Sequence, residues 1–184
     1  MSNSKNSSTE LATKWNVRHQ YSKEKNSSKP TAASILSKYV EFLPASGDAL
    51  DLAAGRGGNA RLLAEHQLTA YAWDLSSVAM QELQADEPGI QTAVRDIVEQ
   101  PPEPESFDVI VVSRFLDRGL CPAIEAALRV NGVLFYQTFI KGLSNPDFML
   151  KPGELPGLFP SLHAQVYVEP IDGNEAGVVA TRLC

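Results

Sequence analysis

Three closely spaced glycines stand where a small polar ligand could be bound. Gly55, Gly57 and Gly58 follow a short apolar run at 49–53 and precede a stretch at 59–66 whose pattern predicts a helix. Glycine lets the backbone adopt a positive φ and lets a ligand come close, and the first N–H groups of a helix favour ligand oxygens. A strand, a glycine turn and a helix start therefore predict a cradle for a small molecule.

Three aspartates lie in or directly after predicted strands. Asp51 lies in the first strand, Asp74 ends the strand 69–74, and Asp96 follows the strand 90–95. Ligands of parallel sheets bind beyond the carboxyl ends of the strands, where an acid after the second strand can accept two hydrogen bonds from a ribose diol. An acid after the third strand can accept from an adenine amino group. The set predicts a pocket for an adenosine-containing ligand.

Predicted strands and helices alternate along the chain. The expected strands cover 49–53, 69–74, 90–95, 107–113, 133–139, 164–169 and 177–183. The expected helices cover 10–21, 30–43, 59–66, 77–87, 121–129 and 153–159, with a turn at 130–132. This alternation predicts an α/β fold, a doubly wound and mostly parallel sheet with helices on both faces. The short, turn-rich connection between the last two strands predicts that they are antiparallel.

The chain divides into a short tail, a covering segment and one domain. Residues 1–9 are rich in Ser and Asn and predict a disordered tail, residues 10–43 a helical lid region, and residues 44–184 the ligand-binding domain. Sixteen basic and twenty-two acidic residues give a net charge of −6, which opposes nucleic acid or an anionic membrane as a partner.

Targeting and metal signals are also lacking in the sequence pattern. No apolar run approaches the roughly 18 residues of a membrane span, and the N-terminus lacks the apolar core of a signal peptide. We therefore expect a cytoplasmic protein. Cys121 and Cys184 belong to no metal-ligand pattern and are expected to be free thiols, so no metal site is predicted.

A dinucleotide is an alternative ligand, because residues 55–60 also satisfy the G-x-G-x-x-A fingerprint, with Asp74 about 20 residues farther on. An NAD-dependent dehydrogenase would in addition need a substrate domain and an acid or base. The predicted sheet uses the whole chain, and no candidate histidine falls at a strand end: His66 resembles a helix-end residue, His163 lies in a loop, and His19 lies in the N-terminal segment. NAD binding is therefore the less favoured interpretation.

The segment 50–57 resembles the first motif of class I S-adenosylmethionine-dependent methyltransferases, and the resemblance extends over most of residues 12–184. Residues 55–60 followed by 71–75 are similar to the first two motifs of the small tellurite-resistance methyltransferase-like group, in which a stretch like 151–155 also occurs. The resemblance implies a Rossmann-like seven-stranded sheet of order 3-2-1-4-5-7-6 with one antiparallel strand.

The same resemblance implies a reaction. The cofactor would be S-adenosyl-L-methionine, the product S-adenosyl-L-homocysteine, and the acceptor a small molecule: a metalloid oxyanion, a thiol, or a carboxylate or hydroxyl metabolite. The alternative is a non-catalytic S-adenosylmethionine-binding or interaction protein on the same fold, since a fold does not determine function.

Roles for individual residues follow from the resemblance. Asp51 would approach the amino end of the cofactor's methionine, directly or through water, and Asp74 would hold the ribose hydroxyls. Asp96 would accept from the adenine amino group, with Leu75 and Ile97 against the ring. The full expected set of cofactor contacts is Asp51, Ala53, Ala54, Gly55, Gly57, Asn59, Asp74, Leu75, Asp96, Ile97 and Ser113.

No catalytic residue is assigned from the sequence, and the substrate-side candidates are Tyr21, Arg18 and Arg114. Some of these positions also have a structural alternative. Asp51 can cap the glycine turn, Asp96 can cap the turn after it, and Arg114 can belong to a surface ion-pair set. Ala53 departs from the family pattern, which usually has a glycine there, and alanine fits if its φ stays negative.

Overall fold

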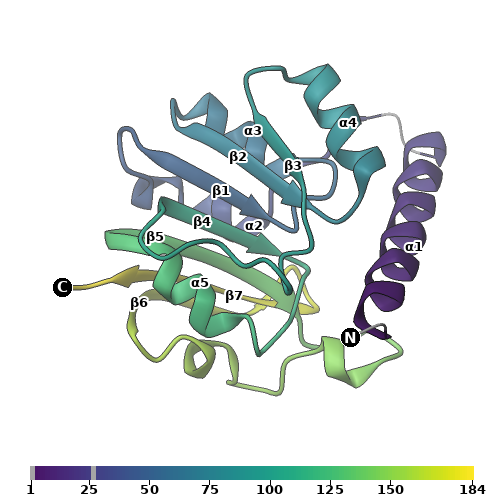
Figure 1. The fold of residues 1–184 in the computed structure, drawn as a ribbon. Helices are drawn as coiled ribbons and strands as arrows, with labels where there is room; N and C mark the ends of the chain where they lie inside the picture. The colour runs from purple at the N-terminus through teal and green to yellow at the C-terminus, as the bar shows by residue number, and fades with distance from the viewer. Residues whose placement is uncertain (1–2, 26–27) are drawn as a thin grey trace.

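A seven-stranded sheet forms the centre of the computed structural model, which describes residues 3–25 and 28–184 (Figure 1). The strand order is β3-β2-β1-β4-β5-β7-β6, and β7 runs antiparallel to both β5 and β6. The strand bounds are β1 Asp48–Leu52, β2 Thr69–Asp74, β3 Gln91–Val94, β4 Phe107–Ser113, β5 Leu128–Phe139, β6 Leu162–Ile171 and β7 Glu175–Arg182. The expected topology is confirmed.

Helices cover both faces of this sheet (Figure 1). The α-helices are α1 Asn3–Lys25, α2 Ser34–Lys38, α3 Gly58–Glu65, α4 Ser77–Asp86 and α5 Cys121–Ala127. The described residues also form three 3-10 helices: η1 Val40–Phe42, η2 Pro146–Phe148 and η3 Leu155–Leu158. Helices α2, α3 and α4 pack on one face, and α5 and η3 pack on the other. Among the described residues, no helix has the length and hydropathy of a membrane span.

The central strand β4 shows why the fold forms from this sequence. Val109 and Val111 face the core on the α2–α4 side, whereas Ile110 and Val112 face the core on the α5 side. Because successive side chains of a strand point to opposite faces, an uninterrupted apolar run is buried only when both faces are covered.

Helix α1 differs from the sequence-based prediction. It begins at Asn3, inside the segment 1–9 that was expected to be disordered, and it continues past the expected end at residue 21. The sequence over 3–25 contains no glycine or proline, so no residue strongly interrupts a helix there. Residues 1–2 lie outside the described part of the chain.

Two other elements also differ from expectation. The segment 30–43, expected as one helix, contains the short helix α2 and the separate 3-10 helix η1. Helix α5 ends at Ala127, and residues 130–132 lie inside β5 because Leu128 already pairs with Phe107 of β4. The predicted turn is therefore an irregularity of the strand, in which Asn131 has a φ of 65°.

Candidate functional site

The glycine turn connects β1 to α3 at the carboxyl edge of the sheet. Gly55 and Gly57 have φ values of 52° and 75°, in the left-handed region where glycine is favoured. Gly57 caps α3, and a Cβ on it would lie 2.5 Å from a methyl carbon of Leu83 in α4. The turn is thus tightly packed against a second helix and needs a residue without a side chain.

Ala53 corrects the expectation that its φ stays negative. Its φ is 58°, so this alanine adopts the left-handed conformation that the glycine of the family pattern would adopt without strain. Such a conformation costs an L-residue roughly 1–2 kcal/mol.

We expect Ala53→Gly to stabilise the protein, by about 1 kcal/mol, because it removes this strain while losing little buried surface. Ala54→Gly is the matched control, since Ala54 does not have a positive φ. The control should be destabilising, because Ala54 is buried in the core on the α2–α4 face, so the substitution removes a packed methyl group and adds freedom to the unfolded chain. Urea unfolding of the three proteins measures both changes, and a destabilising Ala53→Gly would contradict the strain argument.

Asp51 is fully buried beneath the turn and uses both carboxylate oxygens within the protein. Oδ1 accepts a hydrogen bond from Asn59 Nδ2 at 3.0 Å, and Oδ2 accepts from the Ala60 N–H at 3.0 Å, in the first turn of α3. In the structure, Asp51 therefore has the alternative role named above, that of capping the glycine turn and the start of α3. Burial raises the pKa of Asp51 to about 7, against the opposing effect of these hydrogen bonds.

The raised pKa has a consequence for stability. The folded protein keeps the Asp51 proton up to about pH 7, whereas an unfolded aspartate loses it near pH 3.9, so ionisation of Asp51 opposes folding. Its contribution to the free energy of unfolding should fall as the pH rises from about 4 to about 7. Asp51→Asn should reduce the pH dependence of the free energy of unfolding by up to the amount that one bound proton contributes. Urea unfolding at several pH values between about 4 and 7 measures this dependence. Equal slopes in both proteins would contradict the assignment.

Asn59 makes side-chain hydrogen bonds to three other segments of the chain. Its Nδ2 donates to Asp51 and to Ser113 Oγ, at 3.0 Å each, and its Oδ1 accepts from the Ala33 N–H at 2.9 Å. The side chain is buried. Asn59 thus holds the end of β4, the end of β1 and the start of α2 together around the glycine turn.

Asp74 joins the end of β2 to the glycine turn. Its Oδ2 accepts from the Gly55 N–H and its Oδ1 from the Ser76 N–H, both at 2.8 Å. An ionised carboxylate can accept about four hydrogen bonds, so each oxygen retains acceptor capacity after these contacts. Ser76 caps α4 by accepting from the Ala79 N–H.

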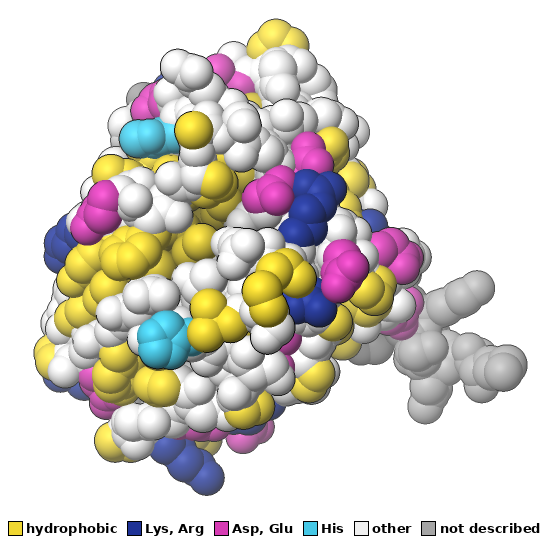
Figure 2. All heavy atoms as spheres, turned by 90° about the vertical axis from the view of Figure 1, so that its left-hand side faces the viewer, with side chains coloured by type: hydrophobic (Ala, Val, Ile, Leu, Met, Phe, Trp, Pro, Cys, Tyr) yellow, Lys and Arg dark blue, Asp and Glu magenta, His cyan; other side chains and the backbone are white. Residues whose placement is uncertain are grey.

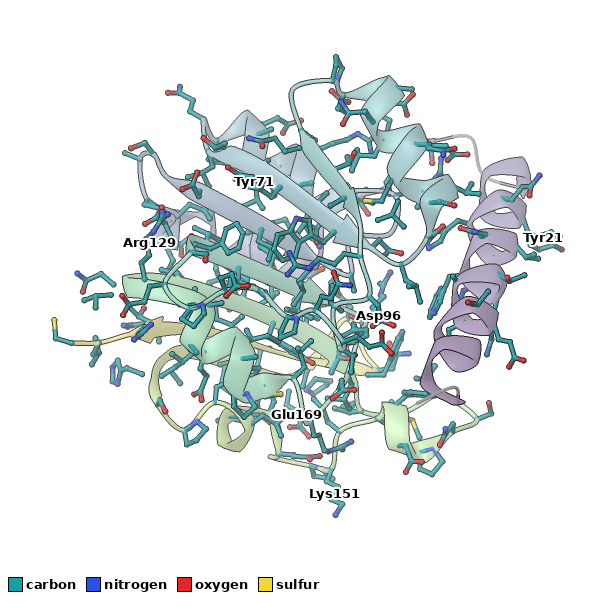
Figure 3. The ribbon with its side chains drawn as sticks, viewed as in Figure 1. Tyr21, Tyr71, Asp96, Arg129, Lys151 and Glu169 are labelled. Atoms are coloured by element: carbon teal, nitrogen blue, oxygen red, sulfur yellow. The ribbon has the colours of Figure 1, made fainter. Side chains whose placement is uncertain are left out.

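Asp96 lies at the same edge of the sheet, near the ends of the strands (Figure 3). Its Oδ1 accepts from the Val98 N–H at 3.1 Å and from the Glu99 N–H at 3.3 Å, so it caps the turn after β3. Ile97 is buried in the core on the α5 face, and Leu75 is half-buried after β2.

Helix α1 lies beyond the carboxyl ends of the parallel strands (Figure 1). Over residues 9–21, the part of α1 whose side chains are described, the half-buried residues form one stripe of helical spacing: Ala12, Trp15, Asn16 and His19. Asn16 Oδ1 accepts from Ser76 Oγ at 2.7 Å and from the Val78 N–H at 3.3 Å. The His19 ring lies against Gly55: a Cβ atom added to this glycine would be 3.2 Å from His19 Cε1.

Asn16 and His19 were not among the expected site residues. The expectation that no histidine lies near a strand end is wrong for His19, which α1 carries to the glycine turn. Burial lowers the pKa of His19, and the nearby charge of Asp74 acts in the opposite direction. The spacing of Ala12, Trp15, Asn16 and His19 is the signal that could have identified this stripe.

The three substrate-side candidates lie in different environments. Tyr21 is 57% exposed and points away from the sheet (Figure 3), so the structure does not bring it to the strand ends. Arg18 lies over the Trp15 ring on α1, 5.0 Å from the ring centroid. Arg114 directly follows β4 at the carboxyl edge, where its Nε donates to Glu175 at 2.7 Å.

Arg118, four residues after Arg114, has a structural function. It donates to both carboxylate oxygens of Glu154 and to the carbonyls of Asp147 and Met149. The Arg118 hydrogen bonds lower the pKa of Glu154 to about 2. Glu154 belongs to the motif at 151–155, so the structure gives this motif a role in fixing the loop after β5. Within the described residues, no group of three or more His, Cys, Asp or Glu is placed to hold a metal ion.

Comparison with protein families identifies a domain. Residues 49–131 match the family model described as a methyltransferase domain. This range runs from β1 to the beginning of β5 and contains the glycine turn, Asp74 and Asp96. No curated protein matches the sequence.

Solved methyltransferase structures have the same fold. TehB from Haemophilus influenzae has 18% sequence identity and a TM-score of 0.69, and the match covers 89% of this chain and 66% of that chain. A TehB-like SAM-dependent methyltransferase from Corynebacterium glutamicum has 18% identity and a TM-score of 0.67, covering 95% and 97%. A SAM-dependent methyltransferase from Mesorhizobium loti has 16% identity and a TM-score of 0.67, covering 82% and 99%. The family model thus places a methyltransferase domain over residues 49–131, and the solved structures show that the chain has the same fold as these methyltransferases.

Proposed function

From the premise that this chain has the class I S-adenosylmethionine-dependent methyltransferase fold, with a methyltransferase domain over residues 49–131, we propose that it methylates a small-molecule acceptor. A metalloid oxyanion, a thiol, or a carboxylate or hydroxyl metabolite fits this class of acceptor. The net charge of −6 favours a small molecule over nucleic acid.

The observation that carries the proposal is the position of Asp74. This buried carboxylate bonds to the Gly55 N–H of the glycine turn and to the start of α4, and it retains acceptor capacity on both oxygens. Two adjacent hydroxyls of a ribose are donors that suit such a carboxylate. The backbone of Gly55 and Gly57 would line the methionine part of the cofactor, with Asp96 near the adenine.

The cofactor supplies a methyl group already activated on a sulfonium sulfur, so the protein's task is to align, enclose and exclude water. Asp51, Asn59 and Ser113 form a hydrogen-bonded chain that fixes the ends of β1 and β4 relative to α3. We assign these residues to positioning. Asp74 and the glycine turn are assigned to binding.

Calorimetry with S-adenosylhomocysteine and NAD tests cofactor choice. We expect S-adenosylhomocysteine to bind and NAD to bind more weakly, because the domain that residues 49–131 match is a methyltransferase domain. Tighter binding of NAD would reverse the proposal. Release of S-adenosylhomocysteine with a panel of small acceptors then distinguishes an enzyme from a non-catalytic binding protein.

We also propose that the segment 10–43 acts as a lid and that α1 is its moving part. One stripe of α1 contacts the domain, through Asn16 at the start of α4 and His19 beside Gly55. Leu11, Val17 and Tyr21 on its other sides are exposed, so little apolar surface holds α1 in place. A helix attached so lightly over a binding edge can open and close with the ligand.

The lid proposal predicts a change in hydrogen exchange. S-adenosylhomocysteine should increase protection in residues 10–29 as well as around Gly55 and Asp74. Asn16→Ala removes three hydrogen bonds and should reduce the protection of α1 by about tenfold, whereas Gln20→Ala on the exposed side should not. If the ligand protects only the glycine turn, and deletion of residues 1–22 leaves turnover intact, α1 is not a lid.

A further inference from the structure

We propose that Arg114, held by Glu175, is the anion-binding group of the substrate site, and that the methyl acceptor carries a carboxylate or a comparable oxyanion. This inference rests on the proposed methyltransferase function and adds the chemical class of the acceptor.

The Arg114–Glu175 pair lies beside the proposed cofactor site. Arg114 directly follows Ser113, the last residue of β4. Ser113 Oγ accepts a hydrogen bond from Asn59 in the first turn of α3, which follows the glycine turn. Glu175 begins β7 and pairs with Phe139 at the end of β5. The ends of β4 and β5 and the start of β7 therefore carry the pair at the same edge of the sheet as the glycine turn.

Glu175 is fixed by contacts on both of its oxygens. It is 2% exposed, its Oε1 accepts from Arg114 Nε at 2.7 Å, and its Oε2 accepts from Gln137 Nε2. Gln137 is itself held, because its Oε1 accepts from the Ile35 N–H at 2.8 Å. The Arg114 N–H also donates to the Gln137 carbonyl at 2.8 Å. This network restricts the direction in which the Arg114 guanidinium can point.

The guanidinium keeps donors available for a ligand. The side chain of Arg114 is 64% exposed, although its partner Glu175 is buried. A guanidinium has five N–H donors, and within the described residues the structure shows no partner for Nη1 or Nη2. Paired N–H donors of arginine match the geometry of carboxylates and related oxyanions.

Arg118 and Arg18 lack this combination of features. Arg118 uses its donors on Glu154 and on two backbone carbonyls, which makes it part of the loop structure. Arg18 is carried by α1 and lies over Trp15. Arg114 combines a position directly after β4, a fixed orientation and unused terminal donors.

The test is a chemical-shift titration with small carboxylates and their neutral amides, acetate and benzoate against acetamide and benzamide. Each titration is run on the full-length protein with and without S-adenosylhomocysteine. We expect the carboxylates to bind and the amides not to bind. Arg114→Gln should weaken carboxylate binding by about tenfold or more, and Arg114→Lys, which keeps the charge but not the paired donors, by less.

Arg129→Gln is the matched control. Arg129 forms ion pairs with Asp48 and Asp108 and lies at the opposite edge of the sheet (Figure 3), the edge that faces the viewer in Figure 2. It should leave carboxylate binding unchanged. Arg114→Gln alone leaves the buried Glu175 carboxylate without its arginine, which can destabilise the fold. The double variant Arg114→Gln/Glu175→Gln removes this carboxylate as well, so a loss of carboxylate binding by the folded double variant is not a loss of folding.

Three results would overturn the inference: no carboxylate binding to the wild type, equal binding of carboxylates and amides, or full carboxylate binding by the folded double variant. Failure of S-adenosylhomocysteine to bind would instead contradict the proposed function. The titrations without this ligand still measure the anion site in that case, so the two failures are distinguishable.

Discussion

Asp74→Asn should weaken S-adenosylhomocysteine binding by about 100-fold. The carboxylate is expected to accept two hydrogen bonds from the ribose, each worth roughly 1.5–3 kcal/mol when an ionised group takes part, and about 3 kcal/mol corresponds to a factor of about 100. In this variant, the Asn NH₂ group takes the place of one carboxylate oxygen. The N–H of Gly55 or of Ser76 then faces a donor in place of an acceptor, which disturbs the turn. Calorimetry measures the dissociation constant directly.

Asp86→Asn provides the matched control for this prediction. Asp86 ends α4, the helix that begins next to Asp74, and it forms an exposed ion pair with Arg61. An exposed pair contributes at most about 1 kcal/mol, and Asp86 lies at the opposite end of α4 from Asp74. If Asp74→Asn binds the ligand as tightly as Asp86→Asn does, Asp74 has only the structural function seen in its backbone contacts.

Asn59→Ala should lower the free energy of unfolding by about 3 kcal/mol or more. Loss of the amide removes partners from the buried Asp51 carboxylate, from Ser113 and from the Ala33 N–H. Each buried polar group left without a hydrogen bond costs about 1–3 kcal/mol, and the neutral form of Asp51 limits its share. Urea unfolding gives the change in stability, and thermal unfolding gives a second measurement.

Asn145→Ala removes the same side chain from an exposed position. Asn145 accepts one hydrogen bond, from the Asp147 N–H at 3.0 Å, at the start of η2. Loss of such a cap costs about 1 kcal/mol. Equal losses in Asn59→Ala and Asn145→Ala would show that Asn59 does not hold the glycine turn, α2 and β4 together.

Much of the site was predictable from local sequence. The alternation of apolar runs and helical patterns identified the strands, and the residues that follow β1, β2 and β3 were placed correctly at one edge of the sheet. The glycines predicted positive φ values, which Gly55 and Gly57 have. These features depend on neighbouring residues and on the backbone, so a linear sequence contains the information they require.

Only the tertiary structure decided which partner each polar side chain has. Asn59 meets Ala33 and Ser113 because three separate segments converge on the glycine turn. Arg114 and Arg118 are four residues apart, yet one pairs with Glu175 and the other with Glu154. Hydrogen bonds depend on distances of about 3 Å and on direction, which the packing of distant segments sets.

The conformation of Ala53 and the position of α1 have the same origin. Alanine ordinarily avoids a positive φ, so the sequence favoured a negative one, but the turn between β1 and α3 requires the left-handed conformation at Ala53. Helix α1 carries few apolar contacts, and Asn16 and His19 acquire their roles only where α4 and Gly55 are present. The sequence by itself determined the strands, most of the helices and the aspartates at the strand ends. The tertiary structure decided the hydrogen-bond partners of the polar side chains, the left-handed conformation of Ala53 and the position of α1 over the strand ends. Each of these three properties depends on residues that are far away in sequence.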